Sequence, residues 1–150
     1  MDGEAGERGR KPTFLGIGAQ KCASTWIYRI LERHPQIRVS ANKELDFFSC
    51  HFDRGYGWYE SQFSGAGARQ VASGEVSPSY FYNPLAVERA KAYNRDFRVL
   101  VSLRDPIERM FSNHLHEVRK GHIANADLSF ESALVRNPMY LHQSLYARHL

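Results

Sequence analysis

Short apolar runs alternate along the chain with stretches in which apolar residues recur every three or four positions. The runs predict buried strands, at residues 13–18, 70–76 and 97–103. The recurrent spacing predicts helices with one buried face, at residues 24–34, 85–94 and 106–120. Strands that alternate with helices are typical of an α/β fold with a central parallel sheet. We therefore expect three layers, α/β/α.

Residues with strong positional preferences mark the helix ends. Pro35 ends the first helix, because the residue before a proline is disfavoured in the α region. Asp105, Pro106 and Glu108 occupy the N-cap, N1 and N3 positions of the third helix, as in a capping box. Gly121 follows its last turn. Two further amphipathic stretches are expected at 130–135 and 141–150.

The remaining segments carry no regular pattern. Residues 1–11 are polar and rich in glycine and charge, which predicts a disordered tail before one domain at 12–150. Residues 36–65 are aromatic but irregular. Three strands are few for a parallel sheet, whose edges are usually covered. The domain is therefore expected to be truncated at its C-terminal end, with a missing segment or a partner chain covering the sheet edge.

Composition narrows the class of protein. The chain of 150 residues contains nine Phe and eight Tyr, enough to build a core and to exclude disorder as the main state. Its apolar runs are too short to span a membrane. A net charge of +4 permits an anionic ligand but is too mild for a nucleic-acid-binding surface. The two Cys and seven His lack metal-ligand spacing, so no metal is expected. A signal peptide is not apparent, which favours the cytoplasm.

The turn after the first strand has the character of a phosphate-binding loop. It joins a strand to a helix, and loop amides and a helix N-terminus in that position favour an anion. Lys21 would add a positive charge, and Ser24 and Thr25 would add hydroxyls. The loop is P-loop-like without being a Walker A motif, since Gln20 precedes the lysine and Cys22 follows it. On these residues alone, an ordinary turn with a surface lysine remains an alternative.

Several segments, taken in order, resemble the sulfotransferases that use 3′-phosphoadenosine 5′-phosphosulfate (PAPS). GAQKCASTW at 18–26 is similar to that family's 5′-phosphosulfate loop, and LRDPIERMFS at 103–112 to its 3′-phosphate motif. Between them lie segments similar to the heparan-sulfate and other carbohydrate-type branch: KELDFF at 43–48, GWY at 57–59 and GEVSPSYF at 74–81. The resemblance spans about residues 13–150. It implies a sulfotransferase that acts on an acceptor hydroxyl, with a carbohydrate as the expected acceptor.

The resemblance also implies roles for individual residues. Glu44 would be the catalytic base, with Phe47 and Phe48 as an apolar wall, and Lys21 would stabilise the leaving group. PAPS would be the sulfuryl donor. Its contacts are expected from the loop and from the later motif, at Gln20, Lys21, Cys22, Ala23, Ser24, Thr25, Arg104 and Ser112. Acceptor contacts are expected from one cation and three aromatic rings that could also belong to the core, namely Lys43, Phe47, Trp58 and Tyr80.

One residue departs from the pattern of the heparan-sulfate branch. Heparan-type enzymes carry a second lysine after the glutamate of their Glu-x-Thr/Ser-Pro segment, and this chain has Val76 there. Lys43 is a possible substitute. Two alternatives stay open from the residues: a P-loop kinase or NTPase, which would need Mg²⁺, and a truncated sulfotransferase remnant without activity.

Overall fold

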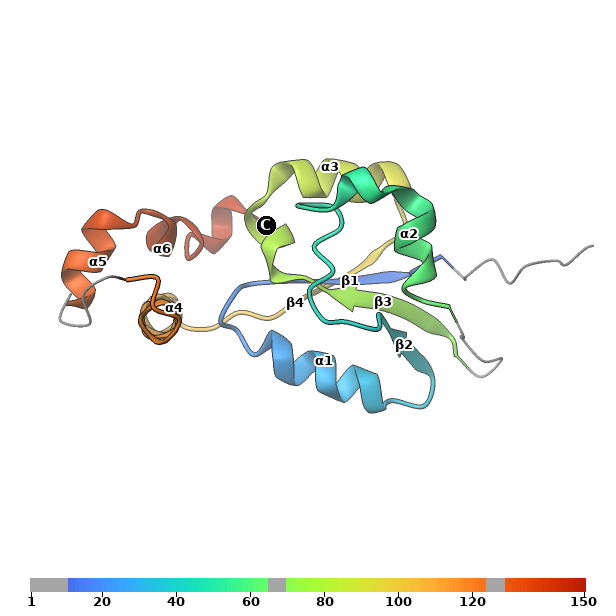
Figure 1. Ribbon diagram of the computed structural model, residues 1–150, viewed down its shortest axis with the longest axis horizontal. Coiled ribbons are helices and arrows are strands. Elements are labelled where there is room, and N and C mark those ends of the chain that lie inside the picture. The colour runs from blue at the N-terminus through green and yellow to red at the C-terminus, as the bar shows by residue number, and fades with distance from the viewer. Residues whose placement is uncertain (1–10, 65–69, 124–128) are drawn as a thin grey trace, which may run out of the picture.

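Four strands form one parallel sheet at the centre of the structure (Figure 1). The computed structural model describes residues 11–64, 70–123 and 129–150, so most of the predicted N-terminal tail lies outside the described residues. The strands are β1 (Phe14–Gly18), β2 (Ile37–Val39), β3 (Ala72–Val76) and β4 (Arg98–Val101), and their spatial order is β2-β3-β1-β4. All three pairings are parallel, which confirms the predicted sheet.

Helices cover both faces of the sheet, as expected for three layers. α1 (Ser24–Arg33) lies on one face, and α2 (Gly55–Ser61) and α3 (Pro84–Tyr93) lie on the other (Figure 1). The short 3₁₀ helices η1 (Phe52–Arg54) and η2 (Pro78–Tyr82) lead into α2 and α3. Beyond the carboxyl ends of the strands lie α4 (Pro106–Arg119), α5 (Phe130–Arg136), α6 (Met139–His142) and η3 (Tyr146–Arg148).

Three elements differ from the sequence prediction. β2 and α2 both lie within the segment 36–65 that was expected to be irregular. β2 has only three residues, with Arg38 between its two apolar positions, which is too short for a recognisable strand pattern. The helix expected at 141–150 is divided into α6 and η3. The other predicted helices and strands are confirmed, with ends that shift by a few residues.

The main hydrophobic core lies between the sheet and the α2–α3 layer. Its fully buried rings are Phe47, Phe48, Tyr59 and Phe63, and the ring planes of Phe47 and Tyr59 stack with centroids 4.4 Å apart. A smaller cluster around Tyr28 of α1 fills the opposite face. The aromatic residues of segment 36–65 are therefore mainly core residues, which explains how a long connection without much regular structure is held in place.

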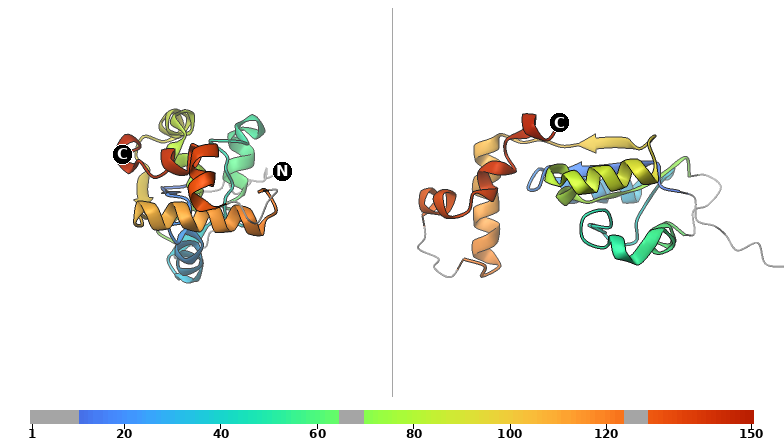
Figure 2. Two further views of the ribbon diagram at one scale, coloured as in Figure 1. Left: turned by 90° about the vertical axis from the view of Figure 1, so that its left-hand side faces the viewer. Right: turned by 90° about the horizontal axis from the view of Figure 1, so that it is seen from above.

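α4 crosses the carboxyl ends of the strands, so it forms a wall at the end of the sheet where open α/β sheets place ligands (Figure 2). Its predicted N-cap is confirmed, because Asp105 Oδ1 accepts hydrogen bonds from the amides of Ile107 (3.0 Å) and Glu108 (2.9 Å). The Glu108 side chain pairs with Arg104. Fully buried Arg109 donates to Ser144 Oγ at 2.5 Å and thereby ties α4 to the segment after α6.

β4 is an edge strand with apolar side chains on both faces. Val99 is 57% exposed and Leu100 is 40% exposed. Parallel strands are usually buried on both faces, so the exposed apolar side chains of β4 are unusual for such a strand.

Candidate functional site

The loop between β1 and α1 is anchored to the segment that follows β4. The Ala19 amide donates to the Ser102 carbonyl (2.7 Å), and Ser102 Oγ donates to the Cys22 carbonyl (2.5 Å). Gly18 has a φ of +126°, and a Cβ there would lie 3.0 Å from the Pro78 carbonyl oxygen, so glycine is required at this point. The phosphate-loop segment therefore has a defined backbone rather than that of a free surface turn.

The loop leaves the N-terminus of α1 open. Lys21 (φ 66°) and Ala23 (φ 62°) are left-handed, a conformation found in short turns whose amides converge on an anion. Ala23 is the N-cap residue and makes no side-chain capping hydrogen bond. The first amides of a helix have no partner within the helix and carry its positive dipole end. This end of α1 is thus suited to bind a phosphate or sulfate group.

A cleft of about 450 Å³ opens directly in front of this helix end. Three parts of the chain line it: the loop with the first turn of α1, the segment after β2, and the C-terminal half of α4. The lining residues are Gln20, Lys21, Ala23, Ser24, Thr25, Lys43, Glu44, His116 and Lys120. Seven of these were predicted site residues, and the fold brings them together from two distant segments.

The cleft concentrates positive charge. Burial lowers the pKa of Lys21, and the nearby charges of Arg119 and Lys120 lower it further. Burial also lowers the pKa of His116, with contributions from Lys21 and Lys120. Cations that destabilise one another in this way would be stabilised by a polyanionic ligand placed between them.

Glu44 is the carboxylate at the edge of this basic cleft. Its side chain is 49% exposed and forms an ion pair with Lys43. The prediction that Phe47 and Phe48 form an apolar wall beside Glu44 is wrong. Both rings are fully buried in the core, whereas the Glu44 side chain faces solvent and Lys43. A carboxylate that is reachable and held beside a cation can still accept a proton from a bound hydroxyl group.

Three predicted donor contacts lie outside the cleft lining. The Cys22 side chain is buried beneath the loop, with Sγ 3.7 Å from the Tyr146 hydroxyl. Tyr146 in turn donates to the Arg104 carbonyl oxygen at 2.9 Å. The Arg104 side chain pairs with Glu108, 2.9 Å away, and Ser112 lies on α4 one turn before His116. Arg104 and Ser112 therefore lie at the same end of the sheet as the cleft, without lining it.

Two of the predicted acceptor contacts have a structural role instead. Phe47 is 0% exposed and Tyr80 is 2% exposed, so neither ring reaches the cleft. Trp58 packs against the same core cluster, and the Arg54 guanidinium lies 4.7 Å from its ring centroid. Of the four predicted acceptor contacts, Lys43 alone lines the cleft.

His116 and Lys120 are cleft residues that the sequence reasoning missed. Both come from α4, where Ser112, His116 and Lys120 are spaced by four residues and so lie along one side of the helix. That spacing was visible in the sequence. What the sequence pattern did not show is that α4 crosses the end of the sheet (Figure 2), which brings His116 and Lys120 into the same cleft as the phosphate loop.

A buried acid, Glu75 of β3, lies behind the segment that carries Glu44. It is 0% exposed, and burial raises its pKa to about 7, an effect partly offset by the hydroxyl groups of Ser77, Tyr80 and Tyr59. Because the folded state holds this proton more tightly than the unfolded chain, Glu75 favours folding fully below its unfolded pKa of about 4.5. That contribution is lost as the pH rises through about 7.

We expect the loss of this contribution to lower the free energy of unfolding by about 3 kcal/mol as the pH rises from about 4.5 to above 7. Urea denaturation across this range, with Glu75→Gln as the reference that cannot ionise, measures the effect. Parallel pH profiles for the two proteins would show that Glu75 does not cause it.

Two features are absent from the described residues. No helix in residues 11–64, 70–123 or 129–150 is long and apolar enough to cross a membrane. Within the same ranges, no group of three His, Cys, Asp or Glu residues is arranged to hold a metal ion.

Comparison with known proteins identifies relatives, although no family model matches the chain. The membrane-associated sulfotransferase kil1 of Dictyostelium discoideum is 31% identical over 105 residues, which cover 69% of this chain and 22% of that protein. Heparan sulfate glucosamine 3-O-sulfotransferase 3B1 of Mus musculus is 29% identical over 149 residues, covering 93% of this chain and 37% of that protein.

A solved structure shows the same fold at a similar level of identity. The crystal structure of a sulfotransferase from Alicyclobacillus acidocaldarius matches with a TM-score of 0.74 and 28% identity, over 93% of this chain and 63% of that one. The chain spans about a fifth to two fifths of the length of the curated relatives. A phosphate loop, an open helix end and a basic cleft at the carboxyl end of a parallel sheet agree with these matches, and the chain belongs to the sulfotransferase family.

Proposed function

We propose that the protein transfers a sulfuryl group from PAPS to a hydroxyl group of a carbohydrate. The observation that carries the proposal is the cleft in which the open N-terminus of α1, Lys21 and Lys120 face the carboxylate of Glu44. An anion site next to an accessible base is what sulfuryl transfer to a hydroxyl requires.

The donor would lie across the carboxyl ends of β1 and β4. Its phosphosulfate would accept hydrogen bonds from the first amides of α1 and from the hydroxyls of Ser24 and Thr25, with Lys21 beside it. Arg104 and Ser112 would hold the 3′-phosphate, since an arginine can donate two parallel hydrogen bonds to a phosphate group. For this, Arg104 would exchange its ion pair with Glu108 for the ligand.

The reaction would proceed by in-line displacement at sulfur. The acceptor oxygen forms a bond to sulfur while the bond between sulfur and the 5′-phosphate oxygen breaks. Glu44 takes the proton of the acceptor hydroxyl, and adenosine 3′,5′-bisphosphate leaves with the electron pair of the broken bond. Lys21 would stabilise the negative charge that develops on the leaving phosphate.

A carbohydrate acceptor is supported by the relatives that are named as heparan sulfate glucosamine 3-O-sulfotransferases. Lys43 and Lys120 line the cleft and would suit an acceptor that itself carries negative charge. Lys43 also offers a cation in place of the lysine that Val76 replaces, as the sequence suggests. Trp58 as an acceptor contact stays a prediction, as does a cytoplasmic location.

The active protein would also need cover for the exposed edge at β4. We infer that further polypeptide, from the same protein or from a partner chain, lies against Val99 and Leu100 in the active state. The exposure of these two apolar side chains supports the inference.

Binding of adenosine 3′,5′-bisphosphate tests the donor site without requiring turnover. At about 100 times its Kd, the ligand is expected to stabilise the fold by about 2.7 kcal/mol, which corresponds to a rise in Tm of about 5–10 °C. Differential scanning fluorimetry measures the rise, and transfer of labelled sulfate from PAPS to a panel of sugars then measures activity.

Two ligands serve as comparisons in the same assay. Adenosine 5′-monophosphate lacks the 3′-phosphate and is expected to stabilise the protein less than the bisphosphate does. A P-loop kinase or NTPase would be stabilised more by ATP with magnesium than by the bisphosphate. That result would contradict PAPS as the donor.

A further inference from the structure

Glu75 is a buried acid that the proposed reaction does not use. Its carboxylate is 0% exposed in β3 and accepts two hydrogen bonds, from Ser77 Oγ (2.5 Å) and from Tyr80 Oη (2.9 Å). The buried Tyr59 hydroxyl lies nearby and, with Ser77 and Tyr80, offsets part of the rise in the pKa of Glu75. Burying a carboxylate is costly even when it is hydrogen-bonded, so a purely structural role would be served better by an apolar residue of similar size.

The two hydroxyls that bind Glu75 each accept a hydrogen bond from the segment that carries Glu44. The Asp46 amide donates to Ser77 Oγ at 3.1 Å, and the Phe48 amide donates to Tyr80 Oη at 3.2 Å. A hydroxyl has one hydrogen to donate. Because an ionised carboxylate can only accept, it draws both hydroxyl hydrogens toward itself and leaves both hydroxyl oxygens free for the two amides.

The backbone held in this way has an unfavourable local conformation. Glu44 (φ 59°) and Asp46 (φ 48°) are both left-handed although neither is glycine. Further hydrogen bonds fix the segment to the strand after it: the Glu44 amide donates to the Val76 carbonyl at 3.1 Å, and Ser79 Oγ donates to Asp46 Oδ1 at 2.5 Å. A left-handed pair of residues persists only where surrounding contacts hold it.

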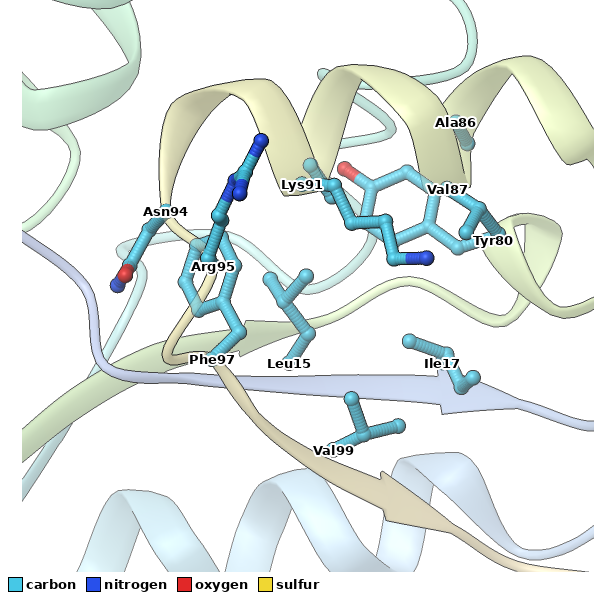
Figure 3. A pocket seen from close by; sticks show the side chains of 11 residues that line it. Leu15, Ile17, Tyr80, Ala86, Val87, Lys91, Asn94, Arg95, Phe97 and Val99 are labelled. Carbon is cyan, nitrogen blue, oxygen red and sulfur yellow. The ribbon is translucent and has the colours of Figure 1, made fainter.

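The ring of Tyr80 packs among apolar side chains on the other side of this network. Its ring lies between α3 and the strand that carries Leu15 and Ile17, where it lines an apolar cavity of about 190 Å³ (Figure 3). The packed ring fixes the position of Tyr80 Oη, which donates to Glu75 and accepts from the Phe48 amide.

We propose that Glu75 is a positioning residue for Glu44. Through Ser77 and Tyr80, its carboxylate orders the segment 44–48 and so holds the Glu44 side chain at the cleft. This inference rests on the proposed function only for the role of Glu44 as the base. The hydrogen-bond relay itself is a property of the fold.

The test replaces Glu75 by glutamine, which keeps the shape but adds a donor. The glutamine carbonyl oxygen can still accept a hydrogen bond from one of the two hydroxyls, Ser77 or Tyr80. The glutamine NH₂ group would face the other hydroxyl as a donor, so that hydroxyl would have to turn its own hydrogen away. At pH 8, we expect the exchange of at least one of the two amides, Asp46 or Phe48, to accelerate by about 100-fold in NMR hydrogen exchange. We also expect sulfuryl transfer to slow by about 10- to 100-fold, with the Kd for adenosine 3′,5′-bisphosphate unchanged.

Three variants control the interpretation. Ser77→Ala is expected to accelerate exchange at Asp46 alone, and Tyr80→Phe at Phe48 alone, which separates the two arms of the relay. Glu60→Gln makes the same change at a carboxylate that accepts from a tyrosine hydroxyl, Tyr93 Oη at 3.0 Å; the Tyr93 ring packs against the Phe48 ring, but the Glu60–Tyr93 hydrogen bond does not involve the backbone of the segment 44–48. It is expected to leave both amides and the transfer rate unchanged.

The outcomes are distinguishable. Unchanged exchange at both amides in Glu75→Gln would overturn the relay, and accelerated exchange with an unchanged transfer rate would overturn its role in positioning Glu44. A general loss of protection across the sheet would overturn the inference as well, because Glu75 would then support the whole fold. Failure of the wild-type chain to transfer sulfate would count against the proposed function, while the exchange data would still decide whether the relay exists.

Discussion

Replacing Glu44 with glutamine is expected to lower the rate of sulfuryl transfer by about 10²- to 10⁴-fold while leaving the affinity for adenosine 3′,5′-bisphosphate nearly unchanged. The amide has almost the same shape as the carboxylate but cannot take a proton from the acceptor hydroxyl. The donor is expected to bind to the other side of the cleft, through the loop after β1 and the first turn of α1. A steady-state assay with PAPS, combined with calorimetric titration of the bisphosphate, separates the two effects.

A matched control for this variant lies on α1. Glu32 is a surface acid paired with Arg29 at 2.8 Å, as Glu44 is paired with Lys43, but it lies outside the cleft. Glu32→Gln is expected to leave transfer unchanged. If Glu44→Gln instead keeps full activity, Glu44 is not the base and its ion pair with Lys43 is structural.

Replacing Lys21 with alanine is expected to weaken both donor binding and transfer. The lysine lies in the loop at the open helix end and carries charge into a partly buried cleft. Loss of a charged hydrogen bond costs about 1.5–3 kcal/mol, or about 10- to 100-fold in Kd. The transfer rate at saturating donor is expected to fall by a further factor of about 10²–10³, because Lys21 also stabilises the leaving phosphate in the transition state.

Lys91 of α3 provides the comparison for Lys21. It borders the apolar cavity under α3 and does not line the cleft, so Lys91→Ala removes the same charge elsewhere on the protein. It is expected to bind the bisphosphate as the wild type does. Equal losses of affinity in the two variants would mean that general attraction between charges, rather than a contact at the loop, governs binding.

The parts of the fold that the sequence predicted are those with local signals. The apolar run before Gly18 and the Asp105-Pro106 pair specify strand, turn and helix by backbone preference alone, and both are present. β2 was missed because a strand of three residues with Arg38 at its centre has too few apolar positions to form a pattern. It is stabilised by parallel pairing with β3, a tertiary contact.

The candidate site, like the fold, could be predicted from the sequence only where the signal is local. The residues near the loop, such as Lys21 and Ser24, line the cleft as the motif suggested. Phe47 and Tyr80 were placed on the acceptor side although they belong to the core, since an aromatic residue suits either environment and its sequence neighbours do not show which way it faces. His116 could be assigned only after the orientation of α4 was known.

Tyr146 of η3 connects two segments that are expected to bind the donor. Its hydroxyl bridges the Cys22 thiol under the phosphate loop and the carbonyl of Arg104, the two places where opposite ends of the donor are expected to be held. The phenol therefore adds a second connection between these two binding segments, beside the hydrogen bonds that Ser102 makes to the loop. A fragment that stops before this tyrosine would keep every proposed ligand-contacting residue and the Ser102 hydrogen bonds, but it would lose the side-chain contact that joins the buried thiol of the loop to the backbone of Arg104.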